Sequence, residues 1–329
     1  MARALTLVRR RLLGSIPVLL LVVALTFLLL ESASGDAADA YLLSIGGGDA
    51  AFAETLRQAY GLDQSVWARL WLYVQALARL DLGWSVAFNR PVSDLVLERL
   101  PNTLLLMGTA TALSFALGSF LGILAGSRPG SLRDRLLSAG SLTLYAVPGF
   151  WLGLVLVIVF SVWLRWLPTS GLETIASGKH GLARAADIGR HLVLPVGALG
   201  VIYTALFLRV MRSGMAEIWE RDFILFARSR GIPRRRILLS HVARNALLPL
   251  VTVLGLQSAA MLGGSVVIES VFAIPGFGRL AHEAVSGRDA PLLMGVILVS
   301  AVMVIAVNLL IDVVYAALDP RIGGREAGP

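Results

Sequence analysis

Residue types that perform chemistry are scarce in this chain of 329 residues. It has no cysteine, which excludes a disulfide, a thiolate metal site and a cysteine nucleophile. Its single lysine, Lys179, precedes His180, and Glu173 stands where a phosphate-binding P-loop needs its first glycine. We therefore expect that the chain does not hydrolyse ATP itself.

The remaining polar residues do not form the groups that an active site requires. The four histidines are well separated in the sequence, and the sequence offers no nucleophile–base pair or paired carboxylates. The sequence thus predicts neither an enzyme nor a metal site, and it implies no cofactor.

The composition indicates a membrane protein. Hydrophobic residues make up 57% of the chain and charged residues 15%, whereas soluble domains have about 45–50% and about 25%. The net charge is nevertheless +8. Such basicity can indicate nucleic-acid binding or the cytoplasmic loops of a membrane protein, so the positions of the charges decide between them.

Six stretches without charged residues are long enough to cross a bilayer, which takes roughly 20 apolar residues. They span residues 12–30, 100–127, 136–164, 191–208, 245–268 and 290–311. We expect an all-α membrane protein with six transmembrane helices rather than a soluble protein with six buried helices. The first stretch exceeds the core of a cleaved signal peptide, about 7–15 residues, so we interpret it as a retained anchor.

The charges between the spans indicate the orientation. With both termini in the cytoplasm, the inner segments hold 18 basic and 7 acidic residues, and the outer segments hold 11 basic and 14 acidic residues. This excess of inner positive charge is the bias seen in membrane proteins. We therefore expect a multi-pass protein of the cell (inner) membrane with both termini inside and no role in nucleic-acid binding.

The outer region 31–99 is polar enough to fold at the membrane surface. The sequence predicts a helix over 53–60, ended by Gly61, and a second helix over 66–80. Trp67, Trp71 and Tyr73 on the second helix are candidate membrane-interface or packing residues, and residues 81–85 read as a turn. A small cap over the spans and a role in substrate handling both remain open for this region.

Small residues and prolines mark features inside the spans. Gly118, Gly122 and Gly126 follow one another at four-residue spacing, which predicts a close helix–helix contact within the subunit or between subunits. Pro148 and Pro195 are candidate kinks. The charged residues nearest the spans are at their ends, where they can reach the interface, among them Arg165, Glu269 and Asp312. The lack of a mid-span charge argues against an ion-coupled transporter.

The inner loop 209–244 is expected to contain an amphipathic helix, unlike the uncharged spans. Apolar residues recur at three-to-four spacing from Ile218 to Ala227, with Glu217, Glu220 and Asp222 expected in the early turns. Gly231 and Pro233 are expected to end the helix. Such a helix either docks on a partner protein or lies on anionic lipid within a positively charged loop.

Segments along nearly the whole chain, in their order and spacing, carry a family resemblance. They are Arg9–Arg11, Gly35–Asp36, Tyr60–Asp63, Asp81–Ser85, Arg90–Val92, Pro101–Thr103, Leu167–Gly171, His191–Pro195, Asp222–Gly231, Arg244–Pro249, Glu269–Phe272, Pro275–Leu280, Arg288–Asp289 and Asp319–Arg321. Together they resemble the first permease subunit of the ABC importers for dipeptides, oligopeptides, glutathione and nickel. The chain departs from the family pattern at Ala37, Ile274 and Ala290, all on the outer side.

The resemblance implies a type I ABC importer permease fold. It divides the chain into a first span with the small outer helical region (1–100), a transmembrane domain (101–318) and a cytoplasmic tail (319–329). The implied partners are a second homologous permease, two cytoplasmic ABC ATPases, an external solute-binding protein and the lipid bilayer.

The resemblance also implies two groups of site residues. ATPase coupling would rest on Glu220, Asp222, Phe223, Phe226, Ala227 and Gly231. The outer gate or the contact with the binding protein would involve Glu269, Phe272, Pro275, Gly276 and Gly278. Peptides are the expected cargo, glutathione or a nickel chelate are alternatives, and a secondary transporter is the alternative outside the family.

Overall fold

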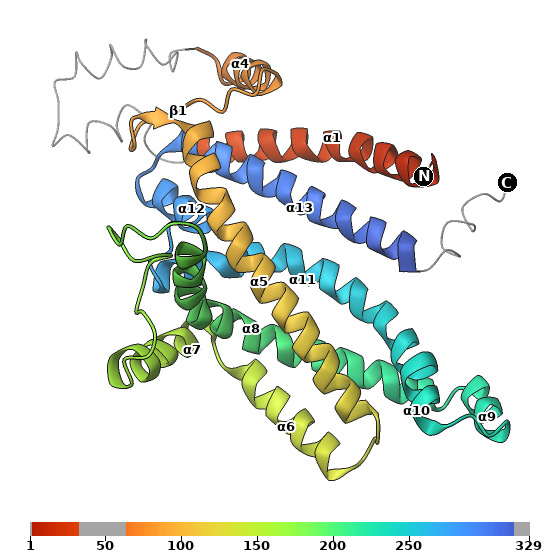
Figure 1. The fold of residues 1–329 in the computed structure, drawn as a ribbon. Helices are drawn as coiled ribbons and strands as arrows, with labels where there is room; N and C mark the ends of the chain where they lie inside the picture. The colour runs from red at the N-terminus through yellow and green to blue at the C-terminus, as the bar shows by residue number, and fades with distance from the viewer. Residues whose placement is uncertain (1, 33–63, 319–329) are drawn as a thin grey trace, which may run out of the picture. The chain divides into compact units, whose positions relative to one another are not determined.

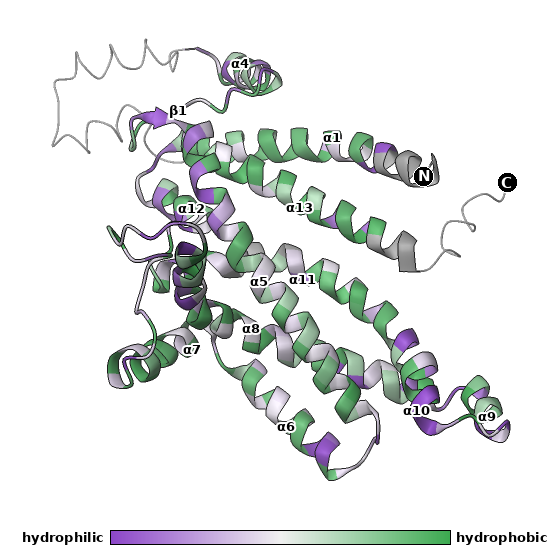
Figure 2. Ribbon diagram, viewed as in Figure 1, coloured by the Kyte–Doolittle hydropathy of each residue, from purple (hydrophilic) through white to green (hydrophobic). Residues whose placement is uncertain are grey.

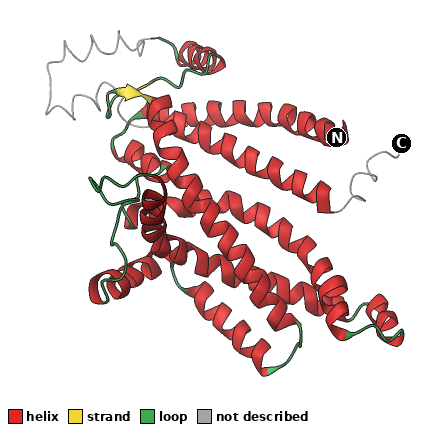
Figure 3. Cartoon of the chain, in the orientation of Figure 1, coloured by secondary structure: helices red, strands yellow, loops and turns green. Residues whose placement is uncertain are grey.

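The computed structural model describes residues 2–32 and 64–318, and helices form most of that length (Figure 1, Figure 3). The longer helices are α1 (Ala2–Glu31), α4 (Val66–Ala78), α5 (Val92–Gly126), α6 (Leu132–Ala146), α8 (Gly181–Trp219), α11 (Arg244–Val271), α12 (Phe277–Ser286) and α13 (Ala290–Leu318). The shorter elements are the helices α7 (Gly149–Leu156), α9 (Asp222–Ser229) and α10 (Arg234–Arg236), the π-helices η1 (Val157–Trp163) and η2 (Ile237–Ala243), and the strands β1 (Trp84–Ser85) and β2 (Arg90–Pro91). The expected all-α fold is confirmed, and the helix predicted over 53–60 lies outside the described residues.

The membrane-crossing helices coincide with the uncharged stretches. Five helical segments are long and apolar enough to span a bilayer, and a sixth span is available if the bent pair formed by α6 and α7–η1 is counted as one. Figure 2 shows hydrophobic residues along α13 and hydrophilic residues around α10. With 39 residues, α8 is about 58 Å long, far more than the roughly 30 Å of a hydrocarbon core. Its ends therefore extend beyond the bilayer.

The third predicted span is not one continuous helix. The axes of Leu132–Ala146 and Gly149–Trp163 differ by 96°. Val147 adopts an extended conformation with ψ 127°, as expected for a residue whose helical conformation would clash with the ring of the following proline. The kink predicted at Pro148 is therefore a full break, whereas α8 continues through the buried Pro195.

The chain forms two compact units that interleave in sequence. The first comprises residues 1–103 and 275–306, and the second comprises residues 104–274 and 307–329. The first unit thus combines the N-terminal part of the chain with α12 and much of α13. Sequence order alone does not indicate this combination.

In the first unit, Asp289 joins the hairpin of β1 and β2 to the start of α13. Its carboxylate accepts hydrogen bonds from the Ser85 hydroxyl (2.6 Å), the Ala87 amide (2.9 Å) and the Leu292 amide (3.0 Å). The last of these bonds caps the N-terminus of α13. The hairpin pairs Trp84 with Pro91, and Gly83 before it has φ +85°. The turn predicted at 81–85 is wrong in its bounds, because residues 84–85 form β1 and the turn of the hairpin lies at 86–89.

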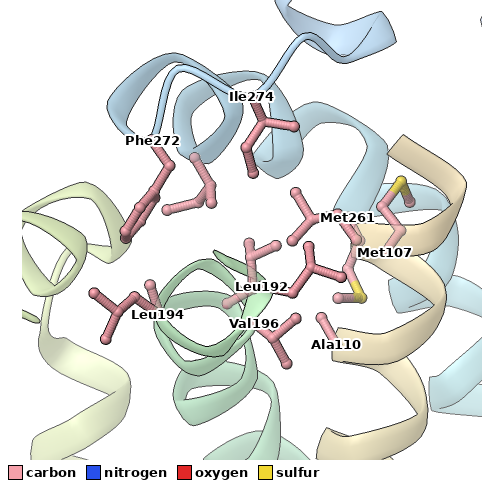
Figure 4. Close-up of a cluster of buried hydrophobic side chains, with 12 residues drawn as sticks. Met107, Ala110, Leu192, Leu194, Val196, Met261, Phe272 and Ile274 are labelled. Carbon is pink, nitrogen blue, oxygen red and sulfur yellow. The ribbon is translucent and has the colours of Figure 1, made fainter. Parts of the chain in front are cut away.

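The second unit contains two hydrophobic clusters along α8. In the first, Met107 from α5, Leu192 and Val196 from α8 and Met261 from α11 are buried together (Figure 4). The second lies farther along α8 and is built from its C-terminal part, α9, η2 and the start of α11. This second cluster positions the predicted coupling segment.

Candidate functional site

The predicted coupling residues lie in a short connection between α8 and α10 (Figure 1). The prediction that Glu217 and Glu220 belong to the early turns of a loop helix is wrong, because Glu217 lies in the last turn of α8 and Glu220 caps it. Buried Met211, Met215 and Trp219 recur every four residues and extend α8 through this region. The separate helix α9 begins at Asp222.

Gly231 ends α9 as the sequence predicts, in a defined geometry. It has φ +71°, a conformation that glycine adopts without strain. Its amide donates to the Arg228 carbonyl at 2.9 Å, and the Ile232 amide donates to the Ala227 carbonyl at 3.2 Å. These two bonds form a Schellman motif, which reverses the chain toward Pro233 and α10.

The two faces of α9 differ sharply in exposure. Ile224 is fully buried and Ala227 is 6% exposed, and both belong to the second hydrophobic cluster. Phe223 and Phe226 are 46% and 63% exposed. Because α9 is attached by one face, the other face presents aromatic surface that the described residues leave open.

Trp219, which the sequence pattern counted only among the apolar positions of the predicted loop helix, connects α9 to the end of α5. Its indole Nε1 donates a hydrogen bond of 2.8 Å to the carbonyl oxygen of Gly126. The guanidinium groups of Arg228 and Arg234 lie 5.1 Å and 5.6 Å from its ring centroid. The signal available in the sequence was its place in the four-residue series with Met211 and Met215.

The glycine series on α5 is a contact within the subunit. A Cβ at Gly118 would lie 2.5 Å from the Cβ of Phe207, and a Cβ at Gly122 would lie 2.5 Å from the Cβ of Met211. At Gly126 the corresponding distance to the Cβ of Met215 is 2.8 Å. The prediction of a close helix–helix contact is confirmed, with α8 as the partner.

A charged pair joins α6 to the same part of α8. The Asp134 carboxylate is buried in the first turn of α6 and accepts from Nε and Nη2 of Arg212 at 2.9 Å and 2.8 Å. Such a two-point pairing holds both side chains in one geometry. In the sequence, both residues stand out only as charges of the predicted inner loops.

The acidic residues of the predicted site are exposed. Glu220 and Asp222 lie on the surface of the connection between α8 and α9. Arg221 pairs with Glu217 one helical turn earlier, and Arg230 lies 5.6 Å from the Phe226 ring centroid. The exposed side of the segment therefore combines two carboxylates, aromatic rings and arginines.

Glu269 and Phe272 belong to the opposite end of α11. With 28 residues, α11 is about 42 Å long, and α9 precedes its other end. Both are buried, so the expectation that Glu269 reaches the interface is wrong. The Phe272 carbonyl accepts from the Gly171 amide at 2.8 Å, and its ring would lie 3.2 Å from a Cβ at Gly153.

Pro275 and Gly276 lie in the turn that precedes α12 in the first unit, and Gly278 lies in the first turn of α12. The Asn102 side chain donates to the Pro275 carbonyl at 2.7 Å, and the Thr103 hydroxyl accepts from the Phe277 amide at 2.7 Å. Gly276 and Gly278 are buried. The turn is thus anchored to α5, and the structure places it in a different unit from Glu269 and Phe272.

Comparison with protein-family models finds two matches. Residues 118–324 match the model described as "Binding-protein-dependent transport system inner membrane component". Residues 4–107 match the model of the N-terminal part of such membrane components. Together the matches include nearly every element described above.

Similar proteins match over almost their whole length. The chain is 37% identical over 314 residues to the oligopeptide transport system permease protein AppB of Bacillus subtilis, covering 95% of this chain and 98% of that protein. It is 36% identical to a putative peptide transport system permease of Brucella abortus, covering 96% and 98%. It is also 36% identical to the glutathione transport system permease protein GsiC of Escherichia coli K12, covering 95% and 97%.

Solved structures support the fold. One is described as inward-facing conformations of the MetNI methionine ABC transporter, with a TM-score of 0.55 at 18% identity, covering 68% of this chain and 96% of that chain. Another is described as an amino acid ABC transporter with histidines, with a TM-score of 0.50 at 17% identity, covering 68% and 94%.

Proposed function

The chain belongs to the family of binding-protein-dependent transport system inner membrane components, and from this premise we propose that it is one of two permease subunits of an ATP-driven peptide importer. The observation that carries the proposal is the match of 95% of the chain to a permease named for oligopeptides. The relative named for glutathione makes that compound the second candidate cargo. Because a P-loop is absent around Lys179, the energy would come from another subunit.

The partner on the inner side would be one of two ABC ATPases, and α9 would be the docking helix. Phe223 and Phe226 supply apolar surface on a helix of 8 residues, which is the type of element that fits a cleft on another protein. Glu220 and Asp222 would pair with basic residues at the rim of that cleft. The alternative occupant of this surface is anionic lipid near the arginines.

Movement of α9 would be transmitted through the second hydrophobic cluster. Ile224 and Ala227 share that cluster with Met215, Trp219 and Ile237, which belong to α8 and η2. Because close-packed interiors transmit displacement rather than absorb it, closure of the ATPases would shift α8 and α11 together. This shift would open the pathway outward, and hydrolysis would reset it.

The orientation proposed from the charges places α9 with the ATPases. The inner segments carry a net charge of +11 and the outer segments −3 when both termini are cytoplasmic. Half of the inner basic residues, 9 of 18, lie between 209 and 244. A protein oriented this way in the inner membrane would present its outer hairpin to a solute-binding protein and its central spans to the second permease.

At the outer side, the gate residues would act through packing. Buried Glu269 and Phe272 would hold the end of α11 against the second unit's other outer segments. Pro275 and Gly276 would shape the anchored turn before α12, and Gly278 would shape the first turn of that helix. Exposed residues next to these would then contact the binding protein.

The test is transport by the complex that copurifies with this chain. The complex is reconstituted into vesicles, and uptake of labelled dipeptides, oligopeptides and glutathione is measured with and without ATP and binding protein. Uptake that requires both supports the proposal and identifies the cargo. Uptake driven by an ion gradient without ATP contradicts it and favours the secondary-transporter alternative.

A further inference from the structure

Helix α4 is too short to cross a bilayer and too apolar for water. Its 13 residues include no acidic residue in the first turn and no buried residue, and Arg69 is its single charged residue. Trp67, Trp71 and Leu72 are 69%, 62% and 50% exposed. At about 20 Å, α4 cannot cross a hydrocarbon core of about 30 Å, and water is a poor solvent for two exposed indoles on one helix.

Arg69 ties α4 to the end of a membrane-spanning helix. It donates to both carboxylate oxygens of Glu31, the last residue of α1, at 3.1 Å and 2.5 Å. Its guanidinium also lies 5.8 Å from the ring centroid of Phe27, one turn earlier. Because Glu31 ends the uncharged span, this contact sets α4 at the depth of the membrane boundary.

The two faces of α4 have different neighbours. Arg69 contacts α1, and Tyr73 follows one turn later on the same side of the helix, where partial burial raises the pKa of Tyr73 to about 12. Trp67 and Trp71, also one turn apart, share the opposite face. Leu72 is exposed as well, at the edge of that face and about 100° around the helix from Trp71. The membrane window of α1 is only 11% buried within the chain, so most of its side chains are open to the bilayer.

We propose that α4 lies parallel to the membrane in the headgroup region of the outer leaflet, with Trp67 and Trp71 inserted among the lipids. Tryptophan favours this region because its ring is apolar while its N–H remains hydrogen-bonded. The helix would thereby hold the start of the outer region against the bilayer. The choice of leaflet rests on the proposed orientation, whereas insertion itself does not depend on the transport activity or on its cargo.

The absence of cysteine from the chain makes a direct test possible. Single variants Trp71→Cys and Leu72→Cys carry an environment-sensitive fluorophore in the full chain, reconstituted in vesicles of phosphatidylethanolamine and phosphatidylglycerol. Leu72→Cys retains both indoles. Asp94→Cys is the control, since Asp94 is an exposed, charged residue in the first turn of α5.

Lipids with a quencher near the headgroup should quench both α4 labels at least about twofold more than the control label, and aqueous iodide should do the reverse. Equal quenching of the α4 and control labels by lipid would overturn the proposal. So would iodide quenching of the α4 labels that disappears on addition of the solute-binding protein, because that result would assign the face to a protein partner. Elution of each variant as a single species in detergent establishes that it is folded.

Discussion

The indole nitrogen of Trp219 donates its hydrogen bond to the carbonyl oxygen of Gly126 at 2.8 Å, joining the last residue of α8 to the last residue of α5. That carbonyl is one of the groups that a helix end leaves without an intrahelical partner. The same indole lies near Arg228 of α9 and Arg234 of α10. One side chain therefore holds together four helices at the base of the proposed docking helix.

Trp219→Phe should weaken this junction while keeping its apolar ring. The variant loses a hydrogen bond with a net contribution of about 1 kcal/mol and part of the cation–π attraction, which is weaker on phenylalanine than on tryptophan. We expect a lower melting temperature in detergent and reduced ATP-dependent uptake. An unchanged melting temperature would show that the contact to Gly126 does not stabilise the protein.

Gly231→Asp should uncouple ATP hydrolysis from transport without removing the protein from the membrane. A side chain at φ +71° strains the Schellman motif and adds a negative charge beside α9. We expect uptake to fall strongly while the ATPase is no longer stimulated by substrate.

Gly178→Asp is the matched control for Gly231→Asp. Gly178 has φ +63° and, like Gly231, has open space around it, but it lies in the loop before α8. The Gly178→Asp variant should transport normally. Normal uptake by Gly231→Asp at normal expression would refute its role in coupling.

Phe226→Ala and Ile224→Ala should separate docking from stability. Phe226 is 63% exposed, so its loss should leave the melting temperature unchanged but reduce copurification of the ATPase. Ile224 is fully buried, and its replacement should cost about 2–5 kcal/mol locally. Limited trypsin digestion after Arg228 and Arg230 should therefore increase only for Ile224→Ala. If Phe226→Ala retains the ATPase fully, the exposed face of α9 is not the docking surface.

Gly122→Ala should destabilise the contact between α5 and α8. The new Cβ would lie 2.5 Å from the Cβ of Met211 and 2.9 Å from the carbonyl oxygen of Leu208, so the helices must separate. Overpacking of this kind costs about 1–3 kcal/mol. Gly108→Ala on the same helix has no atom within 4 Å and should have little effect on thermal unfolding. Equal melting temperatures for the two variants would argue against the close contact.

Asp134→Ala alone should destabilise the protein more than the double change Asp134→Ala with Arg212→Ala. The single change leaves a partly buried guanidinium without its carboxylate, whereas the double change with Arg212→Ala removes both charges. The four melting temperatures of the double-mutant cycle measure the coupling. Additive losses would show that the two side chains act independently.

The sequence by itself determined the features that depend on composition along the chain. Uncharged stretches predicted the spans because charges are costly in lipid, and Gly231 predicted the end of α9 because its turn requires positive φ. The glycine series predicted a close contact because its spacing puts Gly118, Gly122 and Gly126 on one helix face. Each of these signals is local, so one chain is enough to read it.

Only the tertiary structure decided which surfaces meet. It identified α8 as the partner of the glycine series and buried Glu269, which the sequence had placed at the interface. It also extended α8 to Trp219, since the packing of Met215 and Trp219 on α5 continues the helix through residues that the charge pattern assigned to a loop. Periodicity shows that a helix has an apolar face, but the neighbour that covers the face comes from distant sequence. Here that neighbour determines where α8 ends and α9 begins.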